Sequence, residues 1–185
     1  MTNRNERQEK YFVINGSASQ NSSNKKLIDN FANLTKGHFS LTISNDLSTL
    51  PHFDPELSID NTPKTILDFR DKIKNADGIL ICTPEYVCSI PSRLKNAIEW
   101  CVSTTVFSNK PVGLITASLH GQKGHAELQL IMKTVMTKFT DQTTLLIQSV
   151  KGKMNQFGEI TDNETLQDFT NFIDAYKALM ANACR

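Results

Sequence analysis

Short apolar runs alternate with longer amphipathic stretches from about residue 10 to the C-terminus of the chain. Brief apolar runs bounded by turn residues are typical of buried parallel strands, whereas apolar positions three or four residues apart are typical of helices. The apolar runs predict five strands, at 11–14, 39–43, 78–82, 111–116 and 143–147. The amphipathic stretches predict helices from about 23, over 63–74, 91–102 and 124–138, and from 161 onward. This alternation predicts an α/β fold, with a parallel sheet covered on both faces by helices.

The sequence also indicates how the chain is divided. Residues 1–9 are polar and are expected to be disordered, and residues 10–185 are expected to form one domain, because the composition does not shift along the chain. The connection at 44–62 is long and rich in Asp, Ser and Pro. Connections of this length usually have a function or contain a short element of their own.

Composition excludes several classes of function. The net charge is +1 and basic residues are scattered, with no cluster beyond Lys25-Lys26, so no nucleic-acid or membrane-surface partner is expected. No apolar run approaches the roughly 20 residues of a membrane helix, and the N-terminus lacks the apolar core of a signal peptide. The four cysteines and four histidines share no metal-ligand spacing, so no metal site is expected, and a reduced, cytoplasmic protein is the simplest interpretation.

The loop after the first strand has the character of an anion site. Gly16 allows a tight turn, and the following Ser/Asn-rich residues 17–24 run directly into a helix, whose N-terminus favours negative charge. The loop matches neither the dinucleotide nor the NTP glycine pattern, so a phosphate monoester fits better. The alternative is a helix cap in a polar turn, for which Ser and Asn are the commonest residues.

The loop after the third strand, residues 83–89, is stiffened by Pro84 within it and by Pro91 just after it. Backbone amides from Glu85 to Val87 are candidates to meet the edge of a flat heterocycle. For Tyr86 the alternatives are a ligand contact and packing at a subunit interface. Glu85 is either an acid/base group or a salt-bridge partner.

The stretch Thr83 to Trp100, TPEYVCSIPSRLKNAIEW, resembles the TPEY-N-G-SIP-LKNAI-W signature of the NAD(P)H-dependent FMN reductases, and Leu50 to Leu57 resembles a second stretch of that family. The resemblance implies a flavodoxin-like three-layer fold with strand order 2-1-3-4-5. It also implies FMN as cofactor, NADPH or NADH as co-substrate, and pairing into a homodimer or homotetramer through the region 83–107.

The same resemblance implies the site. In the first loop, Ser17, Ser22 and Asn24 match the family pattern, whereas Ser19 stands where the family usually has an arginine, so weaker phosphate binding or compensation by Lys25 or Lys26 is expected. Val87 and Cys88 replace the usual Asn-Gly, which makes the second loop bulkier. The cofactor-binding residues expected are Ser17, Ser19, Ser22, Asn24, Pro84, Glu85, Tyr86, Val87, Ser118, His120 and Gly121.

The third loop, residues 117–124, follows the fourth strand. In the loop 117–124, Ser118, Gly121 and Gly124 match the family, and His120 replaces a glycine. His120 is either a solvated loop residue or, if it lies beside the flavin, a proton donor to quinone or azo substrates. Cys88 is either an inert thiol or a redox-active one.

The function expected is an FMN-dependent NAD(P)H oxidoreductase that passes hydride through the bound flavin to a second acceptor, such as a flavin, a quinone, an azo compound or a metal oxyanion. No catalytic side chain is expected, because the cofactor carries the electron chemistry. The alternatives are a flavodoxin-like electron carrier and a flavin-binding protein with little turnover. An apolar surplus in 83–107 is expected to form a subunit interface, unless these residues pack under the fourth strand; they are Tyr86, Ile90, Trp100, Val102, Val106 and Phe107.

Overall fold

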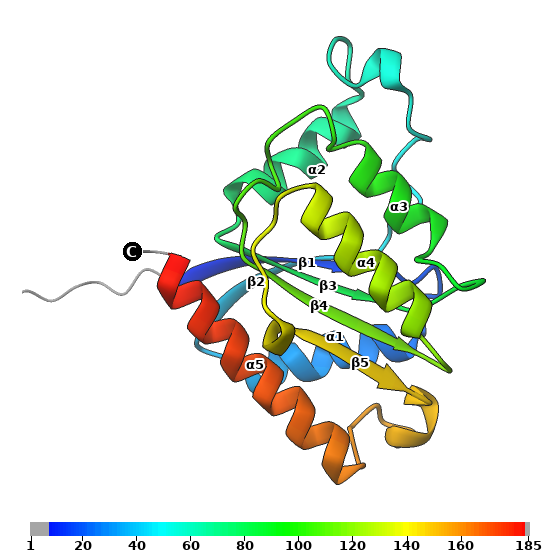
Figure 1. The fold of residues 1–185 in the computed structure, drawn as a ribbon, viewed down its shortest axis with the longest axis vertical. Helices are drawn as coiled ribbons and strands as arrows, with labels where there is room; N and C mark the ends of the chain where they lie inside the picture. Colours follow the sequence, from blue (N-terminus) through cyan, green and yellow to red (C-terminus); the bar gives the residue numbers. More distant parts are fainter. Residues whose placement is uncertain (1–7, 184–185) are drawn as a thin grey trace, which may run out of the picture.

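Five parallel strands form the centre of the molecule in the computed structural model, which describes residues 8–183. Their order is β2-β1-β3-β4-β5, as the resemblance implied. The strands are β1 (Glu9–Asn15), β2 (Phe39–Ser44), β3 (Gly78–Thr83), β4 (Val112–Ser118) and β5 (Thr144–Gln148). All four neighbouring pairs are parallel, so the carboxyl ends of the strands lie along one edge of the sheet (Figure 1).

Helices cover both faces of this sheet. They are α1 (Ser23–Leu34), α2 (Lys64–Asn75), α3 (Ser92–Glu99), α4 (Gln122–Thr134) and α5 (Asn163–Ala183). Figure 1 shows α2, α3 and α4 on one side of the sheet and α1 and α5 on the other. None of the helices in the described part of the chain is long and apolar enough to cross a membrane.

The alternation of side chains along the strands separates two apolar cores. On β1, Phe12 and Ile14 pack into the cluster beneath α2, α3 and α4, whereas Tyr11 and Val13 pack into the cluster above α1 and α5. Neighbouring side chains of a strand point to opposite faces, so a central strand buried on both faces must be apolar throughout. This explains the uninterrupted apolar runs in the sequence.

Several element boundaries differ from the expected ones. β1 begins at Glu9, one residue inside the segment expected to be disordered, and residues 1–7 lie outside the described residues. α3 ends at Glu99, three residues early. α4 begins two residues early, at Gln122, because Gly121 adopts a left-handed φ of 88° and ends the preceding loop. The first turn of α5 is capped by Asp162, whose Oδ1 accepts a 3.0 Å hydrogen bond from the Thr165 amide.

The long connection 44–62 contains a short 3₁₀ helix, Pro55–Leu57, and packs against α3. The Phe53 amide donates a 2.7 Å hydrogen bond to Asn96 Oδ1, and Trp100 Nε1 donates a 2.8 Å hydrogen bond to the Pro51 carbonyl. The resemblance in this stretch therefore reflects the way the connection is fixed to α3.

The expected apolar surplus of residues 83–107 is wrong for most of its members. Trp100 is fully buried, and Ile90 and Phe107 lie within the core beneath α3 and α4. Val106 is partly buried against the same core. Tyr86 and Val102 alone among the six expose a large part of their surface, 42% and 64%. These residues mostly complete the core of one chain, as the alternative held.

Candidate functional site

A cavity of about 600 Å³ opens at the carboxyl edge of the sheet. Loops that follow β1, β3, β4 and β5 form its walls, as is usual for ligand sites in open α/β sheets. It is lined by Ser17, Ser19, Asn21, Ser22, Ser23, Asn24, Pro84, Tyr86, Ala117, Ser118, Leu119, Ser149, Val150, Lys151 and Gly152. The volume falls within the range of about 300–1,000 Å³ that is typical of small-molecule sites.

The loop after β1 approaches β3 closely. The Gly16 amide donates a 2.8 Å hydrogen bond to the Cys82 carbonyl, and a Cβ on Gly16 would lie 2.4 Å from Thr83 Oγ1. Glycine is therefore required here by the close contact between two strand ends, and its φ is not positive. The amide of Ser17 then donates to Asn15 Oδ1 at 3.0 Å, which turns the loop toward the cavity.

The hydroxyl of Ser22 caps α1, which was the alternative to a phosphate contact in the sequence analysis. Ser22 Oγ accepts a 3.1 Å hydrogen bond from the Lys25 amide and also lines the cavity. A capping hydroxyl keeps a lone pair and its proton for a second partner, so the two interpretations are compatible. The N-terminus of α1 faces the cavity through Ser22, Ser23 and Asn24.

Asn24 is more deeply engaged with the protein than the sequence indicated. Its side chain is buried, donates a 3.1 Å hydrogen bond to the Ala117 carbonyl and accepts from the Cys82 thiol at 3.3 Å. Asn24 thus fixes α1 to the ends of β3 and β4. One N–H of its amide remains for a ligand.

The loop after β3 contains a two-residue turn at Val87 and Cys88. Tyr86 and Ser89 exchange both backbone hydrogen bonds, at 2.9 and 3.1 Å. The Tyr86 amide, which was expected to meet a ligand, is therefore used within the turn. Val87 and Cys88 both adopt a left-handed conformation, with φ of 52° and 59°. Such a turn favours Asn-Gly, whereas a β-branched residue at positive φ is an outlier.

Glu85 connects this turn to α4 and takes no part in an ion pair among the described residues. Its Oε2 accepts a 2.7 Å hydrogen bond from the Gly124 amide, and its Oε1 accepts a 3.4 Å hydrogen bond from the Gly121 amide. A Cβ on Gly124 would lie 3.1 Å from Glu85 Cγ, so glycine here permits close contact with Glu85 rather than with a ligand. Glu85 therefore acts as an N-terminal cap of α4.

Glu127 fixes the other end of the same loop. Its Oε2 accepts hydrogen bonds from Ser89 Oγ at 2.6 Å and from the Ile90 amide at 2.8 Å. The turn between Glu85 and Ile90 is thus attached to α4 by two carboxylates, one from each side. These contacts hold one wall of the cavity in place.

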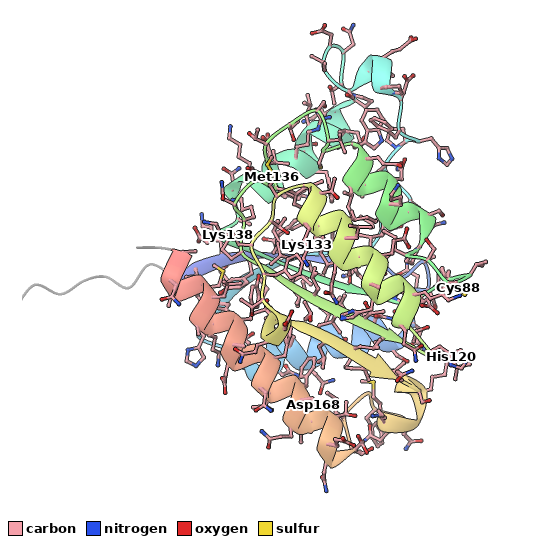
Figure 2. The ribbon with its side chains drawn as sticks, viewed as in Figure 1. Cys88, His120, Lys133, Met136, Lys138 and Asp168 are labelled. Carbon is pink, nitrogen blue, oxygen red and sulfur yellow. The ribbon has the colours of Figure 1, made fainter. Side chains whose placement is uncertain are left out.

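The structure brings together seven of the eleven expected site residues in the cavity wall: Ser17, Ser19, Ser22, Asn24, Pro84, Tyr86 and Ser118. The other four, Glu85, Val87, His120 and Gly121, lie outside it. Val87 is 99% exposed at the turn, and the Gly121 amide is directed at Glu85. Figure 2 shows His120 and Cys88 at the carboxyl edge of the sheet, and both side chains are exposed.

Sequence reasoning missed the segment after β5. Ser149, Val150, Lys151 and Gly152 line the cavity, and the Ser149 amide donates a 3.1 Å hydrogen bond to the Leu119 carbonyl. The signal was present, because a loop after a fifth parallel strand must open on the same edge as the other four. The segment has no recognisable motif and matched no family pattern.

The cysteine thiols of the core are inert. Burial raises the pKa of the Cys82 thiol far above its usual range and raises the pKa of Cys101 to about 12. A thiol that stays protonated is a poor nucleophile and a poor metal ligand. No cluster of residues able to hold a metal ion occurs within residues 8–183.

His125, which the sequence did not single out, lies in the first turn of α4. Its Nδ1 is 2.9 Å from Oγ1 of the fully buried Thr116. Burial lowers the pKa of His125 below its usual value, so the neutral form of the ring is favoured.

Comparison with known proteins settles the family. Residues 10–150 match the family model of the NADPH-dependent FMN reductases. The chain belongs to this family. It is 31% identical over 176 residues to a 2-hydroxy-1,4-benzoquinone reductase of a Burkholderia species, an alignment that covers 91% of this chain and 94% of the relative. It is 30% identical over 139 residues to a quinone reductase of Escherichia coli, covering 70% of this chain and 73% of the relative.

Solved structures agree with the family. The flavoenzyme NAD(P)H:(acceptor) oxidoreductase FerB of Paracoccus denitrificans aligns with a TM-score of 0.81 at 25% identity, covering 95% of this chain and 98% of that chain. The fold is therefore flavodoxin-like, and the activity is that of an NAD(P)H-dependent flavin oxidoreductase with FMN as cofactor.

The residues present fit FMN. The cavity is large enough for a mononucleotide. Hydroxyl and amide donors gather at the α1 N-terminus, as a phosphate monoester requires, and Pro84, Tyr86 and Leu119 supply apolar surface for a ring system.

Proposed function

We propose that the cavity binds FMN with its phosphate at the N-terminus of α1 and its ring system toward the loops after β3 and β4. The observation that supports this placement is the cluster of polar residues at the N-terminus of α1. Ser19, Ser22 and Asn24 line the cavity there and offer the hydroxyl and amide donors that a phosphate needs. Pro84 and Leu119 line it from the loops after β3 and β4.

In this proposal each loop has a distinct role. Ser19, Ser22 and Asn24 donate to the phosphate, and Ser118 lies where the ring and sugar portions meet. Ser118 Oγ already donates a 3.3 Å hydrogen bond to the Glu85 carbonyl, so it also joins the second and third loops. Pro84 and Tyr86 provide a flat apolar surface. FMN, when bound, supplies the hydride and electron chemistry.

Glu85 and Gly121 contribute to binding through position rather than contact. Glu85 holds α4 and the turn in a fixed relation, which preorganises the cavity wall and reduces the entropy lost on binding. His120 and Val87 are exposed and follow the lining residues Leu119 and Tyr86 in the chain, so in this proposal they would meet the second substrate rather than the cofactor.

The acceptor we propose is a small aromatic oxidant, a quinone or a free flavin, with azo compounds and metal oxyanions as slower alternatives. The names of the Burkholderia and Escherichia coli relatives support quinones. The exposed apolar side chains of Tyr86, Val87 and Leu119 support the same class, since flat apolar acceptors would pack against them. Either NADPH or NADH would approach from the same open side.

Steady-state oxidation of NAD(P)H by the FMN-loaded protein tests the activity, with 1,4-benzoquinone as acceptor. Rapid turnover that depends on the quinone supports the reductase. Reduction of the bound flavin without multiple turnovers would instead favour the electron carrier or the flavin-binding protein with little turnover.

The placement of the phosphate has its own test, the variant Ser19→Glu. Ser19 is exposed, so the fold should tolerate the change, whereas a carboxylate would repel the phosphate. We expect FMN affinity to fall at least about tenfold, while riboflavin, which lacks the phosphate, binds as before. Equal FMN binding by both proteins would place the phosphate elsewhere.

We also propose that the protein is a homodimer or homotetramer in a reducing, cytoplasmic location. Tyr86, Val87 and Leu119 support the assembly, since together they expose apolar surface beside the cavity. The free thiols of Cys82, Cys88 and Cys101 support the location. Light scattering in dilute solution tests the first, and a monomeric mass with full activity would contradict it.

A further inference from the structure

One cation lies among the residues that line the cavity. The loops after β1, β3, β4 and β5 supply the lining side chains, and among these Lys151 alone carries a charge. It lies in a short 3₁₀ turn, Val150–Lys153, directly after Ser149, whose backbone is left-handed with φ of 51°. Lys151 is exposed and lines the cavity.

The segment that carries Lys151 is attached to the helix whose N-terminus faces the cavity. Asn30 of α1 donates a 2.7 Å hydrogen bond to the Gly158 carbonyl. The stem of Lys26 packs against Gly158, where a Cβ would lie 3.0 Å from it, and Lys26 Nζ donates to the Gln156 carbonyl at 3.5 Å. These contacts hold residues 156–158 against α1, and Lys151 and the polar loop line the same cavity.

The other two lysines near this loop are engaged elsewhere. Lys25 Nζ forms an ion pair with Asp29 at 2.8 Å, one helical turn along α1. Lys26 Nζ lies 3.5 Å from the Gln156 carbonyl, and neither residue lines the cavity. The expectation that Lys25 or Lys26 compensates for the neutral Ser19 therefore has no support in the geometry.

A phosphate monoester needs more than the loop provides. It carries a charge of about −1.5 to −2 near neutral pH, and a charge-assisted hydrogen bond is roughly twice as strong as a neutral one. The hydroxyls and amides of residues 17–24 are neutral donors, and the partial charge of a helix N-terminus is only about +0.5. A full positive charge in the same cavity is thus the missing component.

We propose that Lys151 supplies the counter-charge for the FMN phosphate, across the cavity from the Ser/Asn loop. The inference rests on the proposed placement of the phosphate. In this arrangement the phosphate lies between the α1 N-terminus and the turn after β5. Lys151 discriminates FMN from riboflavin, because the charge has a partner only when the phosphate is present.

The experiment is a comparison of FMN and riboflavin binding by the full chain freed of flavin, followed by quenching of flavin fluorescence. Lys151→Gln should weaken FMN binding roughly ten- to hundredfold and leave riboflavin binding unchanged. The matched control is Lys153→Gln, which removes the same charge from the same turn. Lys153 is directed at Asp162, 3.5 Å away, and does not line the cavity, so this variant should bind FMN as the parent does.

The salt dependence of binding provides a second readout. The Lys151–phosphate contact lies near the surface and is screened by salt. The FMN dissociation constant of the parent should therefore rise more steeply with added NaCl than that of Lys151→Gln. A guanidinium introduced by Ser19→Arg on the opposite wall should restore FMN affinity in the Lys151→Gln background, and circular dichroism confirms that each variant is folded.

Two outcomes would overturn the inference. The first is unchanged FMN affinity in Lys151→Gln, which together with a raised KM for NADPH would assign Lys151 to the phosphates of the co-substrate. The second is an equal loss for FMN and riboflavin. Failure of this inference is distinct from failure of the placement, because Ser19→Glu weakens FMN binding in the first case and leaves it intact in the second.

Discussion

The Glu85 carboxylate reaches from the end of β3 to the amino end of α4 and accepts a 2.7 Å hydrogen bond from the Gly124 amide. The Gly121 amide donates to its second oxygen at 3.4 Å. An otherwise unsatisfied helix N-terminus and a carboxylate therefore stabilise each other directly beside the cavity. Glu85, which belongs to the TPEY part of the family signature, therefore holds in place the loop that shapes the cavity.

Glu85→Gln should destabilise the protein by about 1–3 kcal/mol, because the amide has one acceptor oxygen for two N–H donors and no charge to oppose the helix dipole. FMN affinity should fall with it, since the cavity wall is less fixed. Urea denaturation and flavin titration measure the two effects. Glu56→Gln, in the exposed connection before α2, is the control. Unchanged stability in Glu85→Gln would show that the hydrogen bonds contribute nothing net.

The double replacement Val87→Asn with Cys88→Gly should stabilise the apoprotein. Both positions have left-handed backbones, which cost roughly 1–2 kcal/mol per ordinary residue, and Val87 is 99% exposed, so no packing within the chain is lost. The rise in Tm should be several degrees, measured by circular dichroism. The matched control, Val102→Asn, changes an exposed valine outside any left-handed position and should leave Tm nearly unchanged. A lower Tm in the double variant would contradict the strain argument.

The same double variant also tests the acceptor site, because neither the Val87 nor the Cys88 side chain lines the cavity and the cavity wall is therefore unchanged. If Val87 packs against the acceptor, as proposed above, the double variant should raise the KM for 1,4-benzoquinone while FMN affinity stays constant. If the KM for 1,4-benzoquinone and the FMN affinity both stay constant, Val87 does not contact the acceptor.

The sequence predicted the sheet, its helices and three of the four loops that form the cavity wall, and the strand order was implied by the family resemblance. It did not predict what individual side chains do within that edge. Glu85 was expected to contact a ligand or a cation, whereas it caps a helix that is distant in sequence. Lys151 was missed because the turn that carries it has no motif, and only the tertiary contacts of α1 bring it to the cavity.

Trp100 illustrates the same limit in the core. Aromatic residues near ligand loops are common at subunit interfaces. Here the connection 44–62 folds over Trp100 instead, and the Pro51 carbonyl accepts a 2.8 Å hydrogen bond from its indole N–H. Phe53 packs edge-on against the indole of Trp100, with 5.3 Å between the ring centroids. Periodicity along α3 does not show whether a loop or a second subunit covers the exposed face, and only the long connection decides it.

Trp100→Phe should therefore lower stability rather than assembly. It removes the hydrogen bond to Pro51 and leaves a void beside Phe53, and we expect a loss of about 2–4 kcal/mol. Urea denaturation measures the loss, and light scattering on the folded variant should give the mass of the parent. A smaller mass with unchanged stability would return Trp100 to a subunit interface.

Arg70 should be equally sensitive, since its buried guanidinium joins α2 to the carbonyls of Trp100 and Ser58. Arg70→Met keeps the length of the side chain but leaves the Trp100 carbonyl without its side-chain donor, while the Ser58 carbonyl keeps the 2.8 Å hydrogen bond from Ser103 Oγ. Each unsatisfied buried group costs about 1–3 kcal/mol. Exposed Lys72→Met in the same helix is the control. Equal stability of the two variants would mean that solvent replaces the lost donors.

His125 should make the protein less stable in weak acid. Its folded-state pKa lies below the usual value near 6.5, so the unfolded chain binds the proton more tightly. The contribution is fully present above about pH 6.5 and is lost as the pH falls through the lower folded-state pKa. His125→Gln keeps a hydrogen-bonding group beside Thr116 but cannot titrate. The difference in unfolding free energy between pH 7.5 and pH 5 should therefore be smaller in the variant, as measured by urea denaturation at each pH. An equal difference in both proteins would assign the acid sensitivity to other groups.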